Sequence, residues 1–177
     1  WLPQLLPHTL ALMLNMYCVS FMTAIMFYIL NDSGRGGKVA LLGPDTRSLV
    51  VPHDAFFAVQ GVVVYLGDSL SRKMVYHAPA LRHPFWYLIC SFTGAALCLV
   101  KVPLLEPLGM FLVFFANGSI YATSTKHIDV AIHHKYNLTA LSVWLFIGDL
   151  GAVVGSNTWQ RVAPLVCAGV DAPHMCL

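Results

Sequence analysis

Runs of about twenty apolar residues alternate along the chain with polar or proline- and glycine-rich stretches. About 20 such residues are needed for one helix to cross the hydrocarbon core of a membrane. The pattern therefore predicts a polar loop at about residues 31–52 and a short tail at about 162–177. It also predicts five membrane-spanning helices, at about residues 9–30, 53–75, 84–102, 108–124 and 137–159. We expect an all-α, polytopic integral membrane protein that forms a single domain.

Composition supports the membrane class. The 177 residues are 58% apolar and only 10% charged, whereas soluble domains carry about 25% charged residues. The net charge is +2, and the ten Lys and Arg residues are scattered rather than clustered. We therefore expect no nucleic-acid partner, since such binding requires a basic patch.

Two further classes of site are not expected. No nucleophile, base and orienting group can be assembled on one predicted face, so the chain does not look like an enzyme and needs no cofactor. His127, Asp129, His133 and His134 are metal-capable, but a histidine-rich interfacial loop explains them as well. No metal site is predicted.

A charged stretch at the end of the second apolar run contains Asp68, Arg72 and Lys73. Asp68 and Arg72 are four residues apart, so they share a helix face and can pair. Leaving one charge unpaired in a membrane costs about 2.5 to 3.5 kcal/mol on insertion scales. The pair is either a substrate or coupling site, or a structural ion pair that fixes helix packing.

The last predicted helix contains a second charge, Asp149, in an otherwise apolar run. It must be protonated, face a cavity or pair with a cation, and Arg72 and Lys126 are the candidates. Small residues recur beside it at spacings of three and four, which lets another helix approach closely. This predicted packing stripe consists of Gly148, Gly151 and Gly155.

The order of these features resembles the C-terminal half of the equilibrative nucleoside transporter family, its seventh to eleventh helices. Residues 68–72 are similar to the family's Asp-x-x-Gly-Arg, with Ser71 in place of glycine, and residues 114–121 are similar to its Phe-Ser-Asn-Gly-Tyr run. The glycine stripe also has a counterpart there. The resemblance implies half of a major-facilitator-like fold. It further implies a nucleoside site formed by Asp68, Arg72, Asn117 and Gly118.

One half of such a carrier cannot enclose a substrate by alternating access. The first hypothesis is therefore a transporter-derived structural or accessory subunit of a larger membrane complex, with other membrane proteins as partners. Because the chain begins with Trp1 rather than Met, it is either processed or a piece of a longer protein. Removal of a targeting segment would favour the mitochondrial inner membrane over the plasma membrane. The alternative is half of a working nucleoside transporter, completed by another chain or a second copy.

A third hypothesis concerns lipid. The basic residues Arg72, Lys73 and Arg82 lie at or just after the end of the second predicted helix. Such clusters can receive an anionic headgroup, for example that of cardiolipin. An anionic lipid is therefore a candidate partner alongside protein subunits and a nucleoside.

Overall fold

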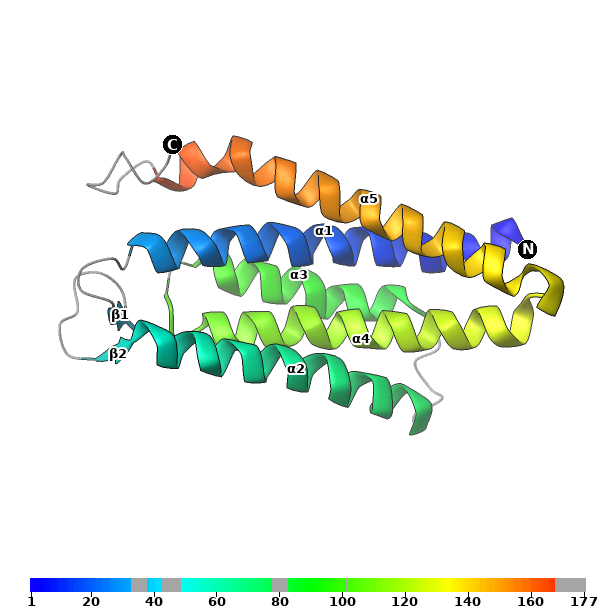
Figure 1. Cartoon of the computed structure of the whole chain (residues 1–177), viewed down its shortest axis with the longest axis horizontal. Helices are drawn as coiled ribbons and strands as arrows, with labels where there is room; N and C mark the ends of the chain where they lie inside the picture. The colour runs from blue at the N-terminus through cyan, green and yellow to red at the C-terminus, as the bar shows by residue number, and fades with distance from the viewer. Residues whose placement is uncertain (33–37, 43–48, 78–82, 101, 168–177) are drawn as a thin grey trace.

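The computed structural model shows an almost entirely helical protein (Figure 1). It describes the backbone of residues 1–32, 38–42, 49–77, 83–100 and 102–167. Side chains are described over the same ranges except 25–32 and 163–167. The five helices are α1 (Leu2–Asp32), α2 (His53–His77), α3 (Phe85–Leu99), α4 (Glu106–Ala131) and α5 (His134–Cys167).

The number and order of the helices agree with the sequence pattern, but several predicted ends are wrong. α1 begins at Leu2 instead of residue 9 and contains Pro7. Pro3 falls in its first turn, where a missing N–H leaves no hydrogen bond unmade. α5 continues past the predicted end at 159 to Cys167 and includes Pro164, so the predicted tail begins too early.

The fourth helix also extends beyond its apolar segment. α4 runs to Ala131, although polarity predicted an end at 124. Thr125 donates its hydroxyl proton to the carbonyl oxygens of Tyr121 and Ala122, at 2.8 and 3.3 Å. The Lys126 ammonium lies over the Tyr76 ring, 5.9 Å from its centroid. Local hydrogen bonds and packing against α2 therefore accommodate polar residues in the helix.

Among the described residues, three helical segments are long and apolar enough to cross a membrane, by length and composition alone. These are Leu2–Ala24, Glu106–Ala131 and His134–Val162. α3 is apolar but has only 15 residues. α2 has 25 residues, but charged side chains occupy its second half. Five apolar runs thus correspond to five helices, of which three have the properties of full spans.

The predicted polar loop contains two short strands that the sequence pattern did not predict. β1 (Lys38–Ala40) pairs antiparallel with β2 (Val50–Pro52), with Val39 opposite Val51. Val39 is buried against Phe56 at the start of α2. The pair of strands therefore covers one end of the helical bundle.

The helices form two groups joined through α1. α5 packs along α1, and α2 and α3 both pack on α4, while α1 also contacts α3 and α4 (Figure 1). Asn15 fixes the junction of α1, α3 and α4. Its Nδ2 donates to Ser91 Oγ at 2.8 Å and to the Val113 carbonyl at 3.3 Å. The charged pair on α2 and the glycine stripe on α5 therefore lie in different helix interfaces.

Candidate functional site

Asp68 and Arg72 form the predicted ion pair on α2. Arg72 Nε donates to Asp68 Oδ2 at 2.8 Å, and its Nη2 donates to Asp68 Oδ1 at 3.2 Å. The contact is bidentate, the geometry in which a guanidinium and a carboxylate interact most strongly. One turn of helix is enough to form this pair.

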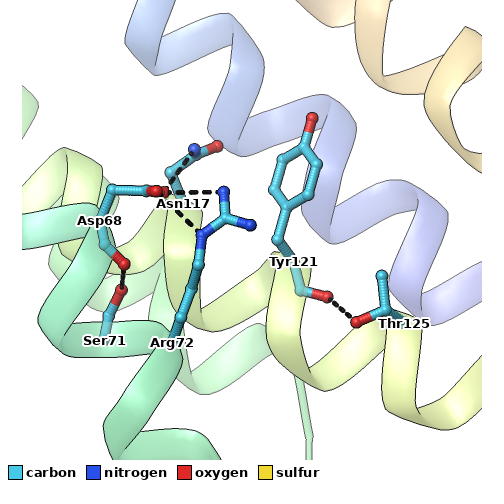
Figure 2. A network of polar contacts seen from close by, with 6 residues as sticks. All are labelled: Asp68, Ser71, Arg72, Asn117, Tyr121 and Thr125. Carbon is cyan, nitrogen blue, oxygen red and sulfur yellow. Dashed lines mark hydrogen bonds and ion pairs between the residues drawn. The ribbon is translucent and has the colours of Figure 1, made fainter. Parts of the chain in front are cut away.

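α4 supplies a third member of the site. Asn117 Nδ2 donates to Asp68 Oδ1 at 3.3 Å, so the carboxylate interacts with both helices (Figure 2). Asn117 Oδ1 is buried and has no hydrogen-bond partner among the described residues. The structure thus brings together the Asp, Arg and Asn that the resemblance assigned to one site.

Glycines let α2 and α4 approach closely enough for this contact. A Cβ added at Gly118 would overlap Ser71 Oγ and the Asp68 carbonyl, and one at Gly67 would lie 2.8 Å from the Phe111 carbonyl. Ser71, where the family has glycine, donates its hydroxyl proton to the Asp68 carbonyl at 2.8 Å. Gly118 therefore contributes to the site by having no side chain, which lets α2 and α4 approach each other closely.

Tyr121 lies one turn after Asn117 and packs against the guanidinium. The Arg72 Cζ is 5.2 Å from the Tyr121 ring centroid, within range of a cation–π interaction. Tyr121 also meets Trp144 of α5 in an edge contact, with ring centroids 5.0 Å apart. Tyr121 therefore connects the charged pair to the buried centre of the bundle.

The site is open on one side. The side chains of Asp68 and Arg72 retain 28% and 46% of their accessible surface. Of the five N–H groups of a guanidinium, only two donate in contacts with described residues. The remaining donors and the carboxylate are available to a solute, water or another protein.

The other predicted polar residues form no ion pair with this site in the described part of the chain. Asp149 is exposed on α5 and pairs with neither candidate, Arg72 or Lys126, although it lies close enough to Tyr121 for its charge to act on that residue. α5 packs mainly on α1, while α2, which carries Arg72, packs on α4. Lys73 is exposed on α2. Arg82 lies outside the described residues.

The predicted glycine stripe faces α1. A Cβ on Gly148 would lie 2.5 Å from the Leu12 side chain. Added Cβ atoms on Gly151 and Gly155 would overlap the backbones of Met13 and Tyr17. The three glycines thus give the close helix approach that their spacing predicts.

The histidines near the α4–α5 connection do not converge on one point. His127 stacks on His8 of α1 with ring centroids 4.3 Å apart, whereas His133 faces His134. Over the described ranges, no group of three or more His, Cys, Asp or Glu side chains could hold a metal ion.

Sequence reasoning missed several buried polar residues. His8 is 6% exposed and lies within an apolar run, where a single histidine gives no periodic signal. Gln60 and Glu106 are 1% and 2% exposed, and both have buried polar atoms without a described hydrogen-bond partner. Asn15, at the three-helix junction, was also missed. Their burial follows from helix packing.

Comparisons with protein-family models, with curated proteins and with solved structures give no match to this chain. The resemblance to nucleoside transporters therefore stays a prediction, based on residues 68–72, residues 114–121 and the glycine stripe.

Proposed function

We propose that this chain is a transporter-derived structural or accessory subunit of a larger membrane assembly. The observation that supports it is the open polar site on α2 and α4. Asp68 and Arg72 pair with each other and with Asn117, yet their outer side remains uncovered. A charged pair facing lipid tails is unfavourable, so a partner protein that covers it would stabilise the membrane-embedded state.

The surroundings of the pair support a protein partner. Tyr65 precedes Asp68 by three residues, so it lies on the same side of α2, and it is 70% exposed. Tyr76, one turn after Arg72, is 62% exposed. Exposed tyrosines around a polar centre are typical of surfaces that become buried in complexes.

Site-specific photocrosslinking tests this proposal. A benzophenone amino acid at Tyr65 should capture a defined membrane protein in native membranes. The same probe at Leu70, 46% exposed and two residues from Asp68, provides the control. Since α-helical residues advance by about 100° each, Leu70 lies on the far side of α2. Capture of lipid alone at Tyr65, or the same products at both positions, would contradict the proposal.

The second candidate function is solute transport as one half of a nucleoside carrier, completed by another chain or a second copy. The observation that favours it is the set of unused polar atoms. Among the described residues, several N–H donors of Arg72 and the Oδ1 of Asn117 have no hydrogen-bond partner. Donors and acceptors in one place suit the hydroxyl groups of a ribose.

Nucleoside flux distinguishes the two functions. Uptake of uridine or adenosine into proteoliposomes, prepared with the crosslinked partner, should fall at least tenfold in Arg72→Gln if the pair holds substrate. Lys73→Gln removes the same charge from the next residue and should leave uptake unchanged. No flux with the partner present would rule out the transport proposal and leave the subunit proposal standing.

An anionic-lipid contact is the remaining proposal for the basic residues. Arg72 and Lys73 are both exposed near the end of α2. A doubly charged headgroup such as that of cardiolipin would receive both cations. Native mass spectrometry of the wild-type protein and Lys73→Gln should then show reduced retention of cardiolipin in the variant. Fractionation of native membranes, followed by detection of the chain, shows whether it lies in the mitochondrial inner membrane or in the plasma membrane.

A further inference from the structure

A pair of stacked histidines joins the beginning of α1 to the end of α4. The His8 and His127 rings lie 4.3 Å apart at an interplanar angle of 17°. His8 Nδ1 is 3.0 Å from Ser124 Oγ, and both residues are buried. His127 Nε2 is buried and has no hydrogen-bond partner among the described residues. Two titratable rings and a hydroxyl group therefore share one site inside the bundle.

The groups around this pair come from α3, α4 and α5, and on α4 the exposed Asp129 lies two positions after His127. His83, just before α3, is close enough for its charge to act on His8. Tyr87 of α3 is buried in the hydrophobic cluster that also contains Leu5 of α1. α5 contributes the uncharged Trp144. In the described part of the chain, no carboxylate forms an ion pair with either stacked ring.

This environment limits the protons that the stacked pair can hold. Neutral imidazoles can stack face to face, and one imidazolium on a neutral ring is also compatible with stacking. Two imidazolium rings at this separation would place like charges in contact, and the charge on His8 would be buried away from water. Histidine ordinarily titrates between about pH 5 and 8. Burial and the first charge oppose the second protonation, so acidification below that range works against the stack.

The stack connects to the open polar site through two residues. Trp144 Nε1 donates to the His8 carbonyl at 3.2 Å. Trp144 also meets the edge of Tyr121, whose ring lies beside Arg72. Movement of α1 away from α4 at His8 would remove the indole hydrogen bond and alter the support of Tyr121.

We propose that His8 and His127 form a proton-binding site whose second protonation separates the beginning of α1 from the end of α4 and loosens the packing of Trp144. The site lies within this chain, so it can be tested without a partner protein. It differs from the Asp68 and Arg72 site in chemistry and position, and Trp144 and Tyr121 connect the two.

Fluorescence of Trp144 in the full chain tests the site. The chain has four tryptophans, so Trp1→Phe, Trp86→Phe and Trp159→Phe together leave Trp144 as the only indole. Trp144 is fully buried. Its emission maximum in lipid nanodiscs should move to longer wavelength, with one midpoint, as the pH is lowered below 5, because burial and the first imidazolium charge oppose the second protonation.

Substitutions of single histidines test whether the stacked pair causes the shift in Trp144 emission. His127→Phe retains a flat ring against His8 but cannot bind a proton, so the spectral change should disappear. His77→Phe replaces an exposed histidine at the end of α2 and should leave it unchanged. If His127→Phe does not fold, as judged by circular dichroism, His127→Gln provides the same test. The proposal is wrong if the emission maximum of the protein with Trp144 as its only indole does not depend on pH. It is also wrong if His127→Phe shows the same shift of the emission maximum.

Discussion

Two of the helix interfaces that contain closely packed glycines differ in their chemistry. Between α1 and α5, the glycine stripe lies against Leu12, Met13 and Tyr17, without an ion pair among the described residues. Between α2 and α4, Gly67 and Gly118 allow an equally close approach, but Asp68 and Asn117 form a polar contact across it.

The difference shows what each interface can do. An apolar glycine interface gains its stability from close packing and has no directional group to offer a ligand. The α2–α4 interface uses the same close approach to bring a carboxylate, a guanidinium and a carboxamide together at an open surface. We therefore assign stability mainly to the first interface and recognition to the second.

The largest effect is expected from a side chain in the stripe. In Gly151→Val, the added atoms would overlap the Met13 backbone, which cannot move without displacing α1. Overpacking typically costs about 1–3 kcal/mol, and backbone overlap places this change at about 3 kcal/mol or more. Unfolding of the purified protein in detergent, followed by circular dichroism, measures the loss.

A matched glycine on α2 provides the control. An added Cβ on Gly61 meets no atom within 4 Å. Gly61→Ala should leave stability unchanged or raise it by up to about 1 kcal/mol, because glycine in a helix is less favourable than alanine. Equal losses from Gly151→Ala and Gly61→Ala would remove the distinction between the two positions.

The second effect tests the close approach at the polar interface. Gly118→Ala should cost about 1–3 kcal/mol, since its Cβ would overlap Ser71 Oγ and the Asp68 carbonyl. Adding Ser71→Gly removes one of these overlaps, so the double variant should lose less than the sum of the two single losses. Strict additivity in thermal unfolding would show that Ser71 does not limit the approach.

The third effect separates recognition from stability. Asp68→Asn removes the ionic partner of Arg72 but keeps the side-chain size. Exposed ion pairs contribute about 1 kcal/mol or less, and Arg72 is half-exposed. The isolated protein should thus lose little stability, while crosslinking from Tyr65 falls severalfold. A loss as large as that of Gly151→Val would show that the pair is mainly structural.

The smallest effect is expected at Asp149. This residue is exposed and has no ion-pair partner among the described residues. Asp149→Asn should change the unfolding free energy of the isolated chain by less than about 0.5 kcal/mol. A larger loss of stability would show that Asp149, like the glycines beside it, contributes to helix packing.

Local spacing accounts for what could be predicted at the site. Asp68 and Arg72 lie four residues apart, so the helix alone brings them together. The contact of Asp68 with Asn117 was expected only through the resemblance, because it joins residues 49 positions apart. The link from Arg72 through Tyr121 to Trp144 had no sequence signal. This link depends on how α2, α4 and α5 pack, because each of these helices supplies one of the three residues.

The sequence by itself determined five helices, their order, the Asp68 and Arg72 pair and the glycine spacing, because these follow from apolar run length and from helical periodicity. Tertiary structure decided which helices are neighbours. It left Asp149 apart from Arg72, brought His8 against His127, and opened one side of the polar site. The physical reason is that periodicity defines the faces of a helix, whereas side-chain packing between helices decides what each face meets.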